Sequence, residues 1–184
     1  GKEVKIDGPA DAVDAGIGYL SEDRKRFGLL LIQDVTFNIA LSSLKNFTNI
    51  FGFFKKSPAV VIAKEGIKTL GIKTPSERQL LKNLSGGNQQ KVVIAKWLAK
   101  DCEILIFDEP TRGIDVGAKD EIYKLLTRLA SQGKSIIMIS SELPEVLRMS
   151  DRIAVMCEGR LTGIIENKDA DQGSIMQLAT KFRD

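Results

Sequence analysis

The sequence predicts an α/β protein whose mainly parallel sheet is interrupted by an all-helical insert. Two short apolar runs, Ile104–Phe107 and 136–139, are continuous rather than alternating, which is typical of strands covered on both faces. Helical patterns alternate with them, and such alternation indicates a parallel sheet. Residues 27–99 carry helical signals only. We therefore expect one domain, with a core subdomain formed by 1–26 and 100–184 and a helical subdomain between them.

The first elements are short. Val4 and Ile6 alternate with charged residues, a pattern that predicts an edge strand. A helix is expected over 10–15, followed by an apolar strand at Ile17–Leu20. The basic run 24–26 follows two acidic residues and is interpreted as a solvated loop.

The insert is expected to contain three helices. Asp34 is a candidate N-cap for a helix near 35–44. The second helix begins at Ser57-Pro58, since proline suits the first helical turn, and ends at Gly71. A third helix is expected over 91–100.

The remaining elements repeat the alternation of strand and helix. In order they are a strand at 104–107, a helix capped by Asp115 over 115–130, a strand at 135–140, a helix at 143–149, a hairpin over 153–165 and a helix at 172–182.

Composition excludes several classes of protein. The chain has 184 residues, enough for one domain with a real core, and its net charge of +3 does not indicate nucleic-acid binding. It has two distant cysteines and no histidine, which argues against zinc and fits the reduced thiols of a cytosolic protein. No run reaches the roughly 18 apolar residues of a membrane helix, so a membrane role would require a partner.

The segment Leu84–Gln90, LSGGNQQ, precedes the third helix of the insert. Gly86 and Gly87 allow another molecule to approach the backbone closely. The unpaired N–H groups at a helix start, together with the helix dipole, favour an anion, and the Ser85 hydroxyl adds a donor. The same residues also fit a plain serine cap after a glycine turn.

A second feature is the pair Asp108-Glu109 at the end of an apolar strand. Ligand sites of α/β proteins lie at the carboxyl ends of strands. Adjacent strand residues point to opposite faces, so the two carboxylates are expected to take different roles. Alone, a strand ending in two acids is a weak signal.

Together, in this order and spacing, the two segments resemble the signature and Walker B motifs of ABC-type ATPases, over residues 3–165. The resemblance implies a truncated ABC-type P-loop domain that binds ATP and Mg²⁺. It also implies roles for three further positions: Asp115 in the D-loop, Ser141 at the switch and Glu22 at the Q-loop.

The implied roles divide the candidate residues into three groups. Asp108 would hold Mg²⁺ through water, and Glu109, with Ser141 at the switch position, would be catalytic. The nucleotide-binding residues would be Ser85, Gly86, Gly87, Asn88, Gln89, Asp115 and Glu22.

A narrower resemblance rests on the segments 22–26, 84–90, 108–115 and 140–145. These look like the C-terminal half of tandem sugar importers of the ribose, galactose and arabinose type. The family implies an N-terminal ATPase half in the same polypeptide or a second ATPase subunit, a membrane permease and, indirectly, a periplasmic sugar-binding protein. It implies a peripheral place on the cytoplasmic face of the inner membrane and no nucleic-acid partner.

The sequence departs from the family pattern in three places. It contains no GxxxxGK[ST] phosphate loop, which is expected upstream of Gly1 in a longer chain. The near match Gly133-Lys134-Ser135 follows a helix and precedes a strand, the reverse of a phosphate loop. Glu22 replaces the Q-loop glutamine, and Ser141 replaces the switch histidine.

These departures suggest an asymmetric ATPase pair. The chain would donate its signature to ATP held by the other half and would carry a degenerate second site, so that alone it would be an inactive part of an ATP-driven translocase. A catalytically inactive assembly or regulatory module and a soluble, non-transport ABC ATPase are the alternatives. Four phenylalanines, at 47, 51, 53 and 54, are either core or part of a permease groove.

Overall fold

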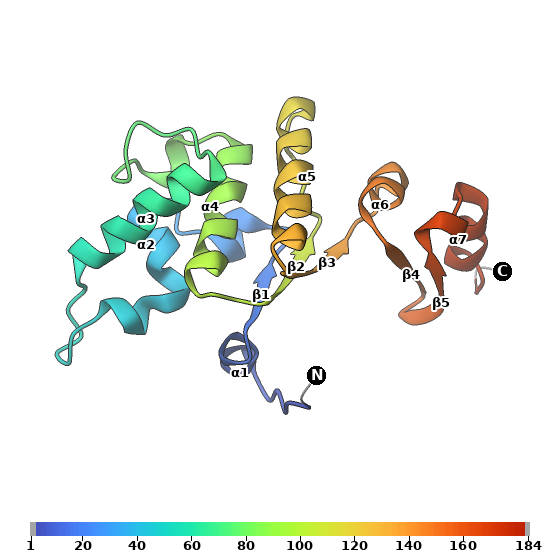
Figure 1. The fold of residues 1–184 in the computed structure, drawn as a ribbon, viewed down its shortest axis with the longest axis horizontal. Coiled ribbons are helices and arrows are strands. Elements are labelled where there is room, and N and C mark those ends of the chain that lie inside the picture. The colour runs from blue at the N-terminus through green and yellow to red at the C-terminus, as the bar shows by residue number, and fades with distance from the viewer. Residues whose placement is uncertain (1–2, 183–184) are drawn as a thin grey trace. The chain divides into compact units, whose positions relative to one another are not determined.

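The computed structural model describes residues 3–182 and divides the chain into two compact units, Gly1–Ile139 and Ser140–Asp184 (Figure 1). Each unit has its own packing. The expectation that 1–26 and 100–184 share one core subdomain stays a prediction.

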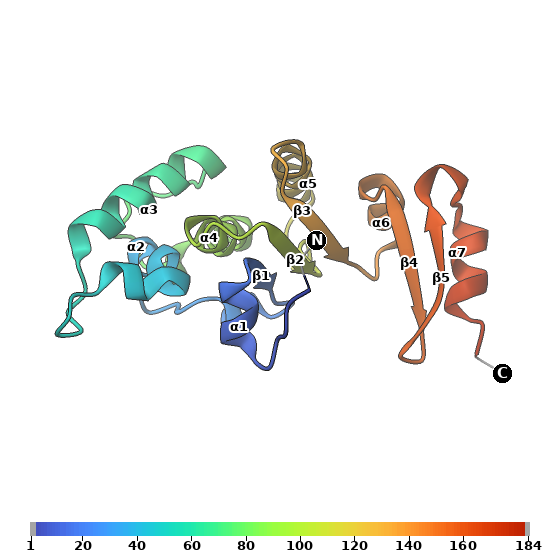
Figure 2. The ribbon, with the colours of Figure 1, turned by 60° about the horizontal axis from the view of Figure 1, so that its bottom comes forward.

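A parallel sheet of three strands lies in the first unit. The strands are β1 (Ile17–Leu20), β2 (Ile104–Asp108) and β3 (Ser135–Ile139), with β2 in the centre (Figure 2). The register aligns Gly18 with Leu105 and Leu105 with Ile136. The α/β class and the parallel pairing are confirmed.

One face of this sheet is covered by α4 (Gly86–Ala99) and α5 (Val116–Ser131). At Gly18 a Cβ would lie 3.0 Å from side-chain atoms of Leu105 and of Trp97 on α4, so only glycine allows this approach of helix and strand. Leu105 and Phe107 are fully buried on the same face.

The other face of the sheet is open among the described residues. Tyr19, Ile137 and Ile139 are each about half exposed, at 48%, 51% and 47%. The prediction that both strands are covered on both faces is therefore wrong for this structure. A continuous apolar run indicates that a strand has apolar side chains on both faces. It does not show that other elements of the chain cover both faces.

The helical part of the first unit consists of α2 (Val35–Ala40), a 3₁₀ segment (Leu41–Phe47) and α3 (Lys56–Leu70), which pack on one another and on α4. Asp34 caps α2, because its carboxylate accepts from the Phe37 N–H at 2.8 Å. Gly71 ends α3 with a left-handed φ of 58°. Both boundaries agree with the sequence, although α3 begins at Lys56.

Two further expectations for the first unit are wrong. Residues 3–6 form no strand, since no described strand pairs with them and Val4 and Ile6 are exposed; the chain instead enters α1 (Pro9–Asp14). The helix α4 begins at Gly86 rather than near residue 91.

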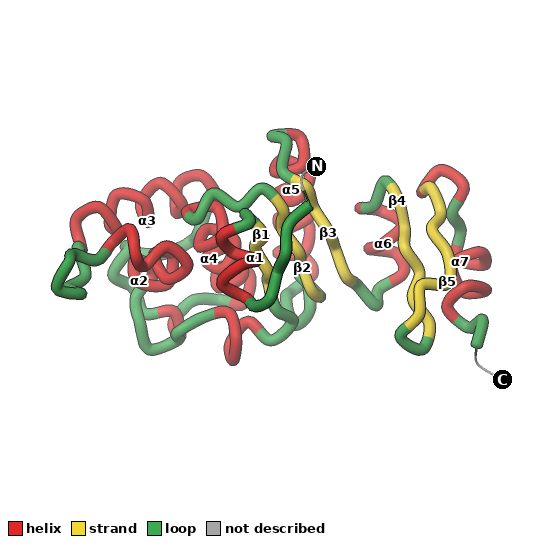
Figure 3. Tube along the Cα trace, turned by 90° about the horizontal axis from the view of Figure 1, so that it is seen from below, coloured by secondary structure: helices red, strands yellow, loops and turns green. Residues whose placement is uncertain are grey.

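The second unit is a hairpin with two helices packed against it (Figure 3). Strands β4 (Arg152–Cys157) and β5 (Arg160–Glu166) are antiparallel, as expected. Ile153 and Val155 form the core with Ile175. The helices are α6 (Leu143–Met149) and α7 (Gln172–Ala179), with a 3₁₀ turn at Asn167–Asp169. In the described part of the chain, no helix is long and apolar enough to cross a bilayer.

Two buried lysines anchor α4. Lys91 is 6% exposed and pairs with Glu121 of α5 at 2.7 Å, and its ammonium also donates to the Gly71 carbonyl at 3.1 Å. Lys96, also 6% exposed, donates to the Gly28 carbonyl at 2.9 Å and lies over the Trp97 ring. Burial lowers the pKa of Lys96 from 10.5 to about 8.

Lys96 should make the stability of the first unit depend on alkaline pH. Its folded pKa is below its unfolded value, so the unfolded state binds the extra proton between about pH 8 and 10.5, and the free energy of unfolding rises with pH in that window. The difference in this free energy between wild type and Lys96→Met should grow by about 3 kcal/mol across the window, measured by urea unfolding. A difference that is flat with pH would contradict this account.

Candidate functional site

The signature segment Leu84–Gln90 forms the N-terminus of α4. Ser85 is the N-cap residue and is exposed, but its hydroxyl makes no capping bond. That hydroxyl instead accepts from Asn88 Nδ2 at 2.9 Å, and Asn88 Oδ1 accepts from the Lys73 N–H at 2.8 Å. Because the Ser85 oxygen serves as an acceptor here, its own proton can be donated outward at a helix terminus that favours anions.

Gln89 lies beneath the segment. It is 4% exposed, and its amide donates to the carbonyls of Leu81 and Leu84 at 3.0 and 3.1 Å. These bonds fix the turn that leads to Ser85. The nucleotide contact expected of Gln89 stays a prediction, whereas its observed role is to support the backbone.

The signature glycines pack against the segment that joins β2 to α5. A Cβ at Gly86 would lie 3.3 Å from the Gly113 carbonyl oxygen, and one at Gly87 would lie 3.0 Å from Ala118 Cβ. Asp115 caps α5 by accepting from the Ala118 N–H at 2.9 Å. The start of α4 and the start of α5 are therefore held side by side.

Arg24 lies at this junction, although the sequence interpretation placed it in a solvated loop. It is 9% exposed, while Lys25 and Arg26 are exposed as expected. Its Nη1 donates to the Arg112 carbonyl at 3.1 Å, and its Nη2 occupies the space that a Cβ at Gly86 would need, 2.7 Å away. Burial lowers the pKa of this guanidinium, an effect that nearby Asp23 opposes. Its Nε has no hydrogen-bond partner among the described residues.

Asp108 ends β2 on the open face of the sheet. The Tyr19 hydroxyl, on the neighbouring strand, donates to its carboxylate at 2.6 Å. This hydrogen bond is the main cause that raises the pKa of Tyr19. The tyrosine thus holds the carboxylate at the carboxyl end of the strand.

Glu109 follows the strand in a left-handed conformation, with φ of 47°. Its N–H still donates to the Ile139 carbonyl of β3 at 2.9 Å. Because the strand ends at Asp108, the alternation expected of the two carboxylates does not extend to Glu109. A non-glycine residue at such a φ is strained, and strain of this kind clusters at functional sites.

Glu22 forms an ion pair with Arg112. Arg112 therefore binds the segment 22–24 twice, through its side chain to Glu22 and through its carbonyl to Arg24. The charge of the Glu22 carboxylate, at the expected Q-loop position, is partly offset by this cation.

Two other segments singled out in the sequence contain the expected switch position and the rejected near match to a phosphate loop. Ser141 belongs to the second unit, in the turn before α6, next to Ser140, whose hydroxyl donates to Glu145. Gly133-Lys134-Ser135 lies between α5 and β3, as expected of a segment that is not a phosphate loop.

The residues present fit a magnesium ion that arrives with phosphates. Among residues 3–182 no three cysteine, aspartate or glutamate side chains gather in a metal-binding cluster. Mg²⁺ in nucleotide sites needs only one or two carboxylates, since phosphates and water complete its shell. The single, positioned carboxylate of Asp108 meets that requirement.

Sequence reasoning missed Tyr19, Arg24 and Arg112 as parts of the site. Tyr19 could have been found from the pairing of β1 with β2, which puts it on the same face as Asp108. No feature of the sequence indicated that Arg24 and Arg112 belong to the site, because charged residues in polar turns are usually solvated.

Comparisons with known proteins agree with this architecture. The family model described as ABC transporter matches residues 3–112. A ribose/galactose/methyl galactoside import ATP-binding protein of Burkholderia lata is 62% identical over 98% of the chain, and a ribose import ATP-binding protein of Clostridium perfringens is 54% identical over 97%. The chain spans 35% and 36% of the length of these relatives.

Solved structures share the fold. The ATP-binding cassette MJ1267 superposes with a TM-score of 0.76 at 18% identity, covering 94% of this chain and 71% of that one. A cassette bound to ADP and Pi, MJ0796, gives 0.70 at 21% identity, covering 88% and 68%. At such identities the likeness concerns the fold.

The contact between Arg24 and Gly86 predicts that the cost of Gly86→Ala depends on the residue at position 24. In wild type, Gly86→Ala forces Arg24 aside and should lower the free energy of unfolding by about 1–2 kcal/mol. With Arg24→Lys, which lacks Nη2, the same change should cost less, because only the 3.3 Å contact with the Gly113 carbonyl oxygen remains and alanine favours helix over glycine by up to about 1 kcal/mol.

A double-mutant cycle by urea unfolding measures this coupling. Gly117→Ala is the matched control, since Gly117 also lies in a first helical turn and a Cβ there would meet only Asp115 Oδ1, at 3.6 Å. Equal costs of Gly86→Ala in both backgrounds would refute the contact.

Proposed function

The chain belongs to the ABC transporter family, and from this premise we propose that it is the C-terminal ATP-binding half of a tandem monosaccharide importer. The observation that carries the proposal is the signature serine, exposed at the start of the 14-residue helix α4. The sequence likeness to import ATP-binding proteins supports the transport role.

In this proposal the half donates its signature to ATP held by the N-terminal half. The Ser85 hydroxyl and the N–H groups of Gly86 and Gly87 donate to phosphate oxygens, and the positive end of the helix dipole favours their charge. Asn88 orients Ser85, and Asp115 lies in the neighbouring turn to meet the other half. Such donors stabilise charge only when they are fixed in advance.

The second site is degenerate. Asp108 would hold Mg²⁺ through water, and Glu109 would orient and deprotonate the attacking water. When bound, the ion would supply positive charge against the phosphate oxygens. Glu22 brings a carboxylate where the family has a glutamine, and Ser141 supplies a short hydroxyl where the family has a histidine, so hydrolysis at this site is weak.

The partners follow from the same reading. The N-terminal half completes the ATPase pair. Conformational changes of this pair are transmitted to a membrane permease, and a periplasmic binding protein delivers the sugar. The protein lies peripherally on the cytoplasmic face of the inner membrane and uses no nucleic acid. A net charge of +3 supports the last point.

Ser85→Arg in the full-length importer should lower sugar-stimulated ATP hydrolysis about a hundredfold, since the arginine removes a fixed donor and blocks the phosphates. The measurement is phosphate release with permease and binding protein present. The matched control is Ser131→Arg, which changes an exposed serine at the C-terminal end of α5. It should leave the rate unchanged.

Glu109→Gln, measured in the same assay, tests the second site. In an asymmetric pair the rate of ATP hydrolysis should change by less than about twofold, because most turnover occurs at the other site. A loss as large as that of Ser85→Arg would mean that Glu109 lies in the main site. No effect of either substitution would favour the inactive assembly module.

The chain alone should bind Mg-ATP no more tightly than about 1 mM, which corresponds to about −4 kcal/mol. Its sequence contains no GxxxxGK[ST] loop, which supplies most phosphate contacts in such sites. Calorimetric titration measures the affinity, and circular dichroism verifies folding. Micromolar binding would show a phosphate cradle elsewhere and would overturn the reading.

A further inference from the structure

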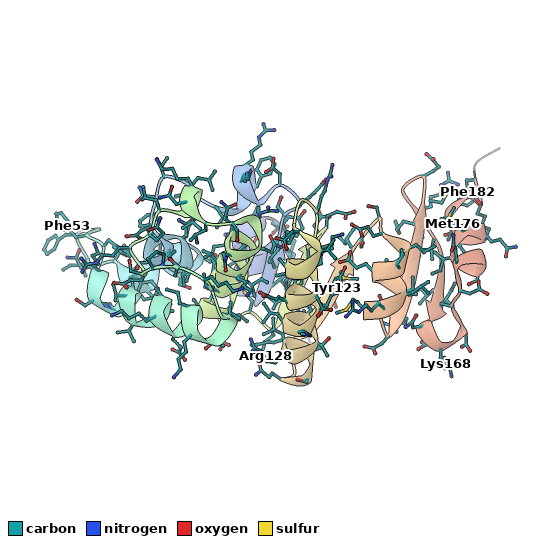
Figure 4. The ribbon with its side chains drawn as sticks, turned by 90° about the horizontal axis from the view of Figure 1, so that it is seen from above. Phe53, Tyr123, Arg128, Lys168, Met176 and Phe182 are labelled. Carbon is teal, nitrogen blue, oxygen red and sulfur yellow. The ribbon has the colours of Figure 1, made fainter. Side chains whose placement is uncertain are left out.

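The turn between Phe47 and Lys56 exposes an apolar surface that the proposed function does not use. Ile50 is 93% exposed, Phe51 77% and Phe53 71%. These three side chains, here called the aromatic tip, fall within four consecutive residues. In Figure 4, Phe53 lies at the outer end of the helical layer and points away from it. Isolated exposed apolar residues are ordinary, but a cluster of this kind marks an interaction site.

The four phenylalanines of this region have two roles. Phe47 is 4% exposed and forms a small core with Ala40 and Ala59, against which Phe54 packs; Phe54 also contacts the Phe37 ring at 5.5 Å between centroids. Phe51 and Phe53 take no part in that core. Phe47 and Phe54 therefore hold the turn against the helices, whereas Phe51 and Phe53 are exposed.

The turn is also internally fixed. The Asn49 side-chain oxygen accepts from the N–H groups of Phe51 and Phe53, both at 2.9 Å. Backbone bonds close the turn below, from Asn49 N to the Phe53 carbonyl at 3.0 Å and from Lys55 N to the Phe47 carbonyl. The apolar side chains are therefore displayed by an ordered turn, which lowers the entropy cost of docking.

The chain on either side of the tip carries charge of one sign. Between Asp34 and Glu65 it contains four lysines and no carboxylate. The lysines are exposed, at positions 45, 55, 56 and 64, and none forms an ion pair with a described residue. Exposed aromatic residues flanked in the sequence by lysines suit the interface of an anionic lipid bilayer, where rings insert between headgroups and ammonium groups meet phosphates.

We propose that the aromatic tip is a membrane-docking element that inserts Ile50, Phe51 and Phe53 into the headgroup region of an anionic bilayer. A convex, protruding turn fits a lipid surface, into which small apolar groups can sink. This contact needs neither ATP nor a signature partner, so it stands or falls separately from the proposed function. It gives a peripheral protein without a membrane-spanning helix in its described part a direct hold on the membrane.

Vesicle flotation of the purified full chain tests the proposal. Vesicles of phosphatidylcholine mixed equally with phosphatidylglycerol should bind the protein, and phosphatidylcholine alone should bind it weakly. Replacing Ile50, Phe51 and Phe53 together by serine should lower the partition coefficient about a hundredfold. Each of Lys45→Gln, Lys55→Gln and Lys56→Gln should lower it about fivefold, and added salt should do the same.

Matched controls keep the result specific. Ile32→Ser removes an apolar side chain that is 77% exposed outside the tip, and Lys82→Gln removes an exposed lysine; neither should change partitioning. Circular dichroism verifies that the serine variant is folded. Equal binding by the serine variant and wild type, or no binding to anionic vesicles, would overturn the proposal.

A tryptophan at the tip separates lipid from a protein partner. The emission of Phe53→Trp should shift to the blue on anionic vesicles and be quenched by brominated lipid, whereas Ile32→Trp should show neither change. Trp97, the single native tryptophan, gives the same background in both variants. A tip tryptophan that ignores vesicles and responds only to added permease would assign the tip to a protein interface and overturn the lipid proposal.

Discussion

The packing of α4 is the constraint on which the rest of the first unit depends. Its residues from Lys91 to Lys96 are buried in succession, so the helix cannot leave one face in water. One side receives α2 and α3, and the other meets β1 and α5. Two buried lysines persist there because each ammonium finds a carbonyl, and one also finds a carboxylate. The N-terminus of this fixed helix then places Ser85 at the surface.

Much of the fold could be predicted from the sequence because its signals were local. Strand β1 has the predicted ends, and Asp34, Gly71 and Asp115 mark helix boundaries through capping and left-handed geometry that depend on a few adjacent residues. The errors arise where the outcome depends on distant residues. Among the described residues, Val4 and Ile6 had the alternation of a strand but no partner strand, and β3 had apolar side chains on both faces but a cover on one.

The start of α4 was placed too late for a related reason. Gly86 and Gly87 have low helix propensity, which argues for a loop up to residue 91. Tertiary contacts outweigh that preference, since Gly113, Ala118 and Arg24 leave no room for a Cβ at these positions. The two glycines thus lower the helix propensity of this segment but allow its close packing. Because α4 begins at Gly86, both glycines lie in its first turn, which supports the interpretation of this terminus as an anion site.

Arg112 links the segment that contains Glu22 to the turn that packs against Gly86. Its ion pair with Glu22 is exposed on both sides, at 67% and 43%, and such pairs contribute only about 0–1 kcal/mol. The bond from Arg24 to its carbonyl is partly buried and has a charged donor, a class worth about 1.5–3 kcal/mol. Arg24 is therefore the stronger constraint on the turn beside Gly86. The pair between Glu22 and Arg112 acts chiefly on charge, since it offsets the Glu22 carboxylate. In the importer half that we propose, the Arg24 bond would hold the signature in place even with Glu22 at the Q-loop position.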